Sequence, residues 1–94
     1  MDSLQDVSTG RYLISTASGT IVLVDLDDKT AIRAPAVTAP QEGFHSNPFD
    51  SDGTVITGVE WVNSPKVGAG MSFRCDPPLN WYISTKVVRI EESE

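Results

Sequence analysis

The chain has 94 residues, a net charge of −6 at pH 7 and a hydrophobic fraction of 39%, which is enough for one domain with one modest core. Its seven Lys and Arg residues are scattered, so binding to nucleic-acid phosphates or to an anionic membrane is disfavoured. Cys75 is the single cysteine, no apolar run is long enough to span a membrane, and the first residues do not resemble a signal peptide; we therefore expect a cytoplasmic protein.

The first half of the chain predicts three strands after a polar arm. Residues 1–10 contain Leu4 and Val7 as isolated apolar residues, and we expect them to form a flexible arm. Residues 11–16 alternate in the manner of a half-buried strand. Gly19 follows in a turn for which it would supply a positive φ.

The segment 20–26, TIVLVDL, is the expected centre of the fold. Val22, Val24 and Leu26 would lie on one face of a strand, while Ile21 and Leu23 would lie on the other. An interior strand buried on both faces is typically apolar in this way. Because a turn and a short strand at 30–34 follow it, we expect it to be the middle strand of a three-stranded meander.

Residues 35–53 form a long predicted loop, since half of the six prolines fall within this range together with Gly, Asn, Asp and Ser residues. Its two phenylalanines, Phe44 and Phe49, are too apolar to remain in solvent. We expect at least one of them to hold the loop across the domain.

The second half returns to strand patterns at 54–62, 67–75, 81–85 and 86–91, and residues 92–94 are an acidic tail. Glycines at 58, 68 and 70 mark expected bends. Helical periodicity is nearly absent, so the prediction is an all-β domain over residues 11–91: a small barrel or sandwich of five to seven mostly antiparallel strands. The expected core is Val22, Val24, Leu26, Val59, Trp61, Met71, Phe73 and Ile83.

Patterns that would carry chemistry are weak. His45, the only histidine, is thirty residues from Cys75, and neither a nucleophile–base pair nor a metal site with paired ligand spacing follows. We interpret Cys75 as a structural thiol beside a loop histidine.

The acidic and glycine-rich segments also favour structural roles. Asp25, Asp27 and Asp28 crowd one turn, where acidic residues are common. The segment 50–53, DSDG, does not fit a calcium-binding loop and reads as a turn that leads into a strand. Gly68-x-Gly70 lacks the third glycine of a dinucleotide site. We therefore expect no catalytic residues, no cofactor and no metal, and a protein that is not an enzyme.

Surface aromatic residues are the best candidates for partner contacts. Trp81 and Tyr82 are neighbours in a predicted strand and must face opposite sides, so one of them should point outward. With Phe44 and Phe49 of the loop, they are the candidate partner-binding residues. The expected function is a protein-interaction or structural module that binds a protein partner or self-associates; the alternative is an acidic inhibitor that mimics nucleic acid to occupy a nucleic-acid-binding protein.

Residues 12–20 followed by 24–27, together with residues 81–90, resemble short β-rich proteins of actinobacteria and their phages that have no assigned chemistry. The resemblance implies a stand-alone intracellular protein of the kind that a phage can encode. No site residues come with it.

Overall fold

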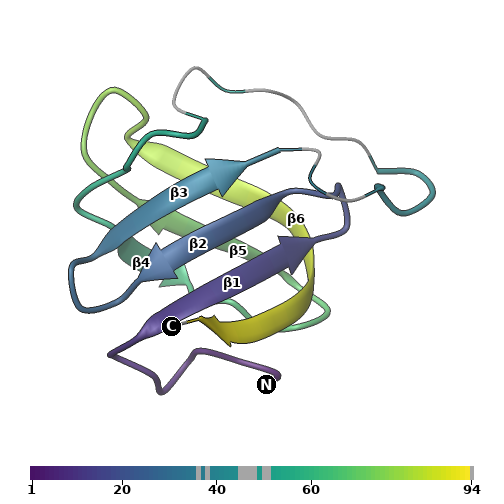
Figure 1. The fold of residues 1–94 in the computed structure, drawn as a ribbon, viewed down its shortest axis with the longest axis horizontal. Helices are drawn as coiled ribbons and strands as arrows, with labels where there is room; N and C mark the ends of the chain where they lie inside the picture. The colour runs from purple at the N-terminus through teal and green to yellow at the C-terminus, as the bar shows by residue number, and fades with distance from the viewer. Residues whose placement is uncertain (36, 38, 45–48, 50–51, 94) are drawn as a thin grey trace.

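The computed structural model describes residues 1–35, 37, 39–44, 49 and 52–93. Within them the chain forms six strands and no helix: β1 (Arg11–Thr16), β2 (Ile21–Asp25), β3 (Thr30–Ala34), β4 (Glu60–Asn63), β5 (Gly70–Arg74) and β6 (Trp81–Ser93). All neighbouring strands are antiparallel. They make one sheet in the order β3-β2-β1-β6-β5-β4, which curls into a half-barrel (Figure 1). The prediction of a small all-β domain is confirmed.

Strand β2 is the middle of the predicted meander, paired with β1 on one side and β3 on the other. Val22 and Val24 point into the barrel and are fully buried, while Ile21 and Leu23 on the opposite face are only half-buried. Burial on both faces was therefore a wrong expectation, because no described segment covers this outer face completely. Gly19 has the predicted positive φ, at 84°.

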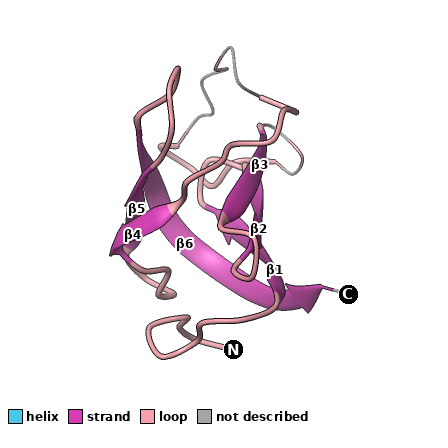
Figure 2. Ribbon diagram, turned by 90° about the vertical axis from the view of Figure 1, so that its left-hand side faces the viewer, coloured by secondary structure: helices cyan, strands magenta, loops and turns pink. Residues whose placement is uncertain are grey.

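Strand β6 is one long strand where the sequence suggests two. Its first half pairs with β5 and its second half with β1, so it is shared by both sides of the barrel (Figure 2). Register shifts lie opposite its middle, between Ser15 and Thr16 of β1 and between Gly70 and Ser72 of β5. Such irregularities increase local twist and bend a strand, which explains how β6 turns the corner without breaking.

The segment 53–59 is less regular than the predicted strand 54–62, of which only the end forms β4. Ile56 and Ala31 exchange two backbone hydrogen bonds of 2.7 and 2.9 Å. On the other side of the segment, the Asp76 N–H donates to the Thr57 carbonyl at 2.9 Å. The segment thus covers the edge of β3 and connects it to the end of β5, and it bends at Gly58, where φ is +67°.

The core fills the inside of the curled sheet. Five of the predicted core residues are buried, Leu26 and Trp61 are partly buried against the core, and Ile83 is 65% exposed. The prediction for Ile83 is wrong because the residue lies on the outer face of β6. The buried apolar residues are Leu4, Tyr12, Ile14, Ala17, Val22, Val24, Ala31, Ile56, Val59, Met71, Phe73, Tyr82, Val87 and Ile90.

The amino-terminal arm is anchored, contrary to the expectation of a flexible arm. Leu4 is 1% exposed and belongs to the core, and its N–H donates to the Pro65 carbonyl at 2.9 Å. Ser3 forms a bridge with Lys66. An isolated apolar residue was enough to anchor the arm because its side chain joins the buried core cluster.

Candidate interaction surface

The four aromatic candidates lie in different environments. Tyr82 is 5% exposed and is part of the core, so it is not a surface contact. Its ring lies 5.3 Å from that of Phe73 and 5.8 Å from that of Phe49. Burial raises the pKa of the Tyr82 hydroxyl, and Arg33 partly offsets this increase. Phe49 packs edge-on against Tyr82, which confirms that a loop phenylalanine holds the loop across the domain.

Of the other candidates, Phe44 and Phe49 are both partly buried and Trp81 is exposed. Phe44 is half-buried, with the Lys86 ammonium 5.9 Å from its ring centre. Trp81 is 40% exposed on the outer face of β6. Because alternate residues of a strand face opposite sides, the burial of Tyr82 and the exposure of Trp81 follow from one another.

Two cross-strand rows make up the surface around Trp81. In the first row, Trp81 lies opposite Arg74 of β5, which lies opposite Glu60 of β4. The Arg74 guanidinium is 5.8 Å from the centre of the Trp81 ring. This row therefore has an aromatic residue at one end and a carboxylate at the other.

The second row adds aliphatic side chains. Ile83 lies opposite Ser72, which lies opposite Asn63, and the Asn63 amide donates to the Ser72 hydroxyl at 3.1 Å. Val62 is the extra residue at a register shift in β4 and is 48% exposed. Residues i and i+2 of a strand lie on the same face about 7 Å apart, so the two rows are adjacent. Ser72 itself is buried, at 4% exposed. We call the surface formed by the other residues of the two rows the Trp81 face; it consists of Glu60, Val62, Asn63, Arg74, Trp81 and Ile83.

A buried ion pair lies on the inner side of the same sheet. Arg33 of β3 is 4% exposed, and its Nη1 lies 2.6 Å from Oδ1 of Asp52. The second oxygen of Asp52 accepts the Phe49 N–H at 2.7 Å, while the Arg33 guanidinium lies 3.9 Å from the centre of the Phe49 ring. Arg33 and Asp52 therefore fix Phe49 over Tyr82.

Sequence reasoning missed the Arg33–Asp52 pair. The segment 50–53 was interpreted as a turn, and Arg33 was interpreted as one of several scattered charges. The signal that could have found the pair is the alternation of β3, which places Arg33 on the same face as buried Ala31. A cation at an inward position needs a carboxylate partner.

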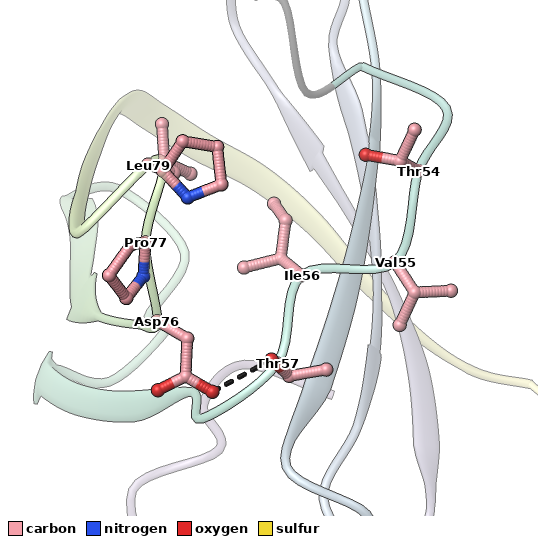
Figure 3. A pocket seen from close by; sticks show the side chains of 8 residues that line it. Thr54, Val55, Ile56, Thr57, Asp76, Pro77 and Leu79 are labelled. Atoms are coloured by element: carbon pink, nitrogen blue, oxygen red, sulfur yellow. Dashed lines mark hydrogen bonds between the residues drawn. The ribbon is translucent and has the colours of Figure 1, made fainter.

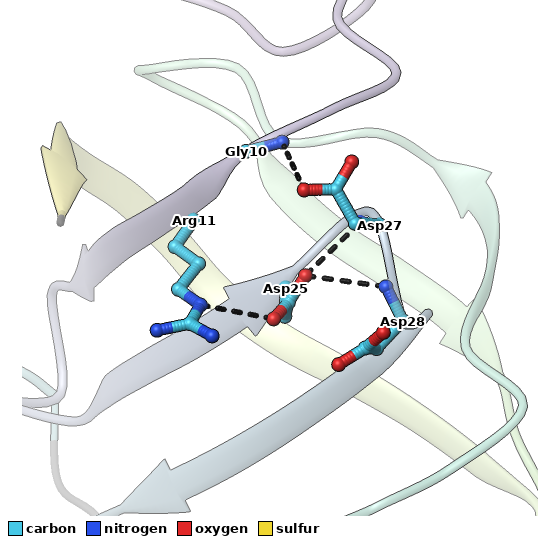
Figure 4. Close-up of polar contacts among 5 residues, drawn as sticks. All are labelled: Gly10, Arg11, Asp25, Asp27 and Asp28. Carbon is cyan, nitrogen blue, oxygen red and sulfur yellow. Dashed lines mark hydrogen bonds and ion pairs between the residues drawn. The ribbon is translucent and has the colours of Figure 1, made fainter.

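The acidic turn between β2 and β3 is held together by hydrogen bonds to the carboxylate of Asp25 (Figure 4). Oδ1 of Asp25 accepts the N–H groups of Asp27 and Asp28 at 3.0 and 3.2 Å, and its Oδ2 accepts Nε of Arg11 at 3.0 Å. The Asp28 N–H is the largest cause of a lowered pKa of Asp25; burial opposes it, and Arg11 and the Asp27 N–H add to it. Asp25 therefore closes the turn as an ionised hydrogen-bond acceptor.

Cys75 is half-buried, and burial followed by the charge of Asp76 raises the pKa of its thiol. His45, its expected neighbour, lies outside the described residues. Across the part of the chain that the structure describes, no three His, Cys, Asp or Glu side chains gather closely enough to hold a metal ion. Within that same part, no helix has the length and apolar character that a membrane crossing requires.

Comparison with protein-family models, with curated proteins and with solved structures finds no match to this chain.

Proposed function

We propose that this chain is a non-enzymatic protein-interaction module and that the Trp81 face is its contact surface. The observation that carries the proposal is the exposure of Trp81, Ile83 and Val62 on one contiguous face at 40%, 65% and 48%. Tryptophan is enriched among residues that dominate binding energy, and exposed apolar clusters with a polar rim are typical of such surfaces.

The rigidity of the sheet beneath supports this surface. Phe73 and Tyr82 alternate with Arg74 and Trp81 along β5 and β6, and both are buried. An anchor on a rigid strand loses little conformational freedom on binding, which favours affinity. Arg74 and Glu60 supply opposite charges at the rim, where they contribute orientation more than binding free energy.

The alternative function is an acidic inhibitor that mimics nucleic acid. Such an inhibitor needs acidic side chains that face solvent in rows. Three acidic residues are instead paired with arginines: Asp25 with Arg11, Asp52 with Arg33, and Glu91 with Arg89. These pairs favour the interaction module.

Capture from a cell lysate at two salt concentrations distinguishes the two functions. We expect Trp81→Ala to lose the captured protein, while Val67→Ala, at an exposed position in the turn before β5, retains it. Capture through an apolar surface changes little with salt, whereas capture by mimicry weakens steeply as screening increases. A captured nucleic-acid-binding protein that moderate salt releases, with Trp81→Ala unaffected, would refute the module.

Self-association is tested in the same variants. Strand β4 is at the edge of the sheet, and a second copy that pairs with it would also cover part of the Trp81 face. Sedimentation of the purified chain over a range of concentrations detects such a dimer. If the partner is a second copy, Trp81→Ala shifts the equilibrium to monomer and Val67→Ala does not.

A further inference from the structure

A small pocket lies at the tip of the β5–β6 hairpin, beside the segment that covers β3. Its volume is about 190 Å³, and its apolar walls include Ile56 on one side and Pro77, Pro78 and Leu79 on the other. Figure 3 shows the Ile56 side chain pointing toward the turn that carries the prolines and Leu79. Asp76 lines the same pocket and is the only charged residue among the described residues that line it.

The carboxylate of Asp76 is exposed to solvent and is oriented by one hydrogen bond. Its Oδ2 accepts the hydroxyl of Thr57 at 2.8 Å (Figure 3). The carboxylate also lies directly over Gly58: a Cβ at that glycine would be 2.5 Å from Oδ1 and 2.7 Å from Cγ. A side chain at residue 58 would therefore displace the carboxylate from the pocket.

The second oxygen, Oδ1, takes part in none of the hydrogen bonds found among the described residues, and Asp76 forms none of their ion pairs. A carboxylate beside apolar walls, on a chain of net charge −6, attracts a cation that carries an apolar stem. A lysine side chain has this composition, because its methylenes pack on apolar surfaces while its ammonium keeps a polar partner.

We propose that this pocket binds a lysine side chain of the protein partner. The inference rests on the proposed function. Leu79 of the pocket lies two residues before Trp81, which begins β6, so a partner that contacts Trp81 lies close to the pocket along the chain.

Size and geometry favour lysine over arginine. A cavity of about 150 Å³ is enough to hold a benzene molecule, so the pocket of about 190 Å³ holds the five heavy atoms of a lysine side chain beyond Cα. Arginine binds carboxylates best through paired hydrogen bonds to both oxygens, and the Thr57 hydroxyl takes one of the acceptor positions of Oδ2. An ammonium group needs no such pair and can bind Oδ1 alone.

Titration with small probes tests the pocket without the partner. N-acetyl-lysine methylamide is added to the isotopically labelled chain, and the amide signals of Thr57, Gly58, Asp76 and Leu79 are followed by NMR. We expect a saturable shift confined to these signals, with a dissociation constant on the order of millimolar. The norleucine probe, which lacks the ammonium, and the arginine probe should each bind about fivefold more weakly.

Two variants complete the test. Asp76→Asn keeps an acceptor for Thr57 and should weaken the lysine probe about fivefold. Asp28→Asn makes the same change of net charge on an exposed turn and should leave the affinity unchanged. Four results would each overturn the assignment of the pocket. The norleucine probe could bind as tightly as the lysine probe, or the lysine probe could bind Asp76→Asn as tightly as the original chain. The shifted signals could lie elsewhere in the chain, or the shifts could fail to saturate at about 100 mM probe. None of these results depends on whether Trp81→Ala loses a captured partner, so failure of the pocket is distinct from failure of the proposed function.

Discussion

Replacing Gly58 by alanine isolates the contact that shapes the Asp76 pocket. Gly58 has φ +67°, and a Cβ there would collide with the Asp76 carboxylate at 2.5 to 2.8 Å. A non-glycine residue in the left-handed region costs about 1 kcal/mol. Displacing the carboxylate also loses its hydrogen bond with Thr57, worth about 1 kcal/mol. We expect Gly58→Ala to lower the free energy of unfolding by about 2 kcal/mol and the melting temperature by about 10 °C.

A double-mutant cycle separates these two contributions. Asp76→Ala alone should cost about 1 kcal/mol, because it removes the hydrogen bond with Thr57. In the Asp76→Ala background no carboxylate remains to collide, so Gly58→Ala should cost only the backbone contribution of about 1 kcal/mol. The double variant should therefore be more stable than the sum of the single effects predicts, by about 1 kcal/mol.

Urea denaturation is carried out on the original chain, the two single variants and the double variant. If the slope of the transition is the same for all four, differences between their midpoints give the differences in the free energy of unfolding. Gly53→Ala is the matched control, because its φ is +78° and an added Cβ would meet no atom of the described residues beyond its chain neighbours within 4 Å. It should show the backbone cost and no coupling to Asp76→Ala. The reasoning would be refuted if Gly58→Ala were as stable as the original chain, or if its cost were the same with and without Asp76.

Three further predictions concern the core, the acidic turn and the loop. Val24→Asp, at a fully buried position, should lower the free energy of unfolding by about 3 kcal/mol or more. Ile83→Asp, on the outer face, should lower it by about 1 kcal/mol or less. Similar melting temperatures for the two variants would contradict the burial of Val24. The lowered pKa of Asp25 stabilises the fold at pH values above 3.8, the ordinary pKa of an aspartate, and this stabilisation is lost as the pH falls through the folded-state pKa. Asp25→Asn should therefore be less stable than the original chain at pH 7, and the difference should shrink below pH 3.8. A difference in urea midpoints that stays constant with pH would exclude this role. Phe49→Ala, which removes the ring between Arg33 and Tyr82, should cost about 2 kcal/mol, below the value for a fully buried phenylalanine because Phe49 is partly buried. Unchanged stability in urea denaturation would show that Phe49 does not hold the loop.

Periodicity predicted the strands well where a two-residue alternation is strong. The meander of β1, β2 and β3 and the inward row of β5 follow from side chains that alternate between core and solvent. Ile83 was assigned to the wrong face for a related reason. Trp81, Tyr82 and Ile83 are all apolar, so no alternation is visible, and only pairing with Ser72 and Arg74 settles which residue points inward.

Contacts between distant segments could not be predicted in this way. The anchoring of Leu4 depends on contacts with the core and with Pro65, and the pairing of Ile56 with Ala31 depends on how far the sheet curls. Asp76 and Gly58 are far apart in the sequence, and their contact depends on the same curl. Of the candidate site, the sequence predicted that one of two aromatic residues faces outward; the rows that surround Trp81 required the strand register.

Photo-crosslinking from two positions tests the Trp81 face most directly. A photoreactive amino acid is placed at Ile83 on this face or at Val67 away from it, both exposed, and the chain is irradiated in its native cells. We predict a discrete crosslinked protein from position 83, absent when Trp81→Ala is added, and none from position 67. Equal crosslinking from both positions, or a product at 83 that persists with Trp81→Ala, would contradict the assignment of the Trp81 face as the contact surface.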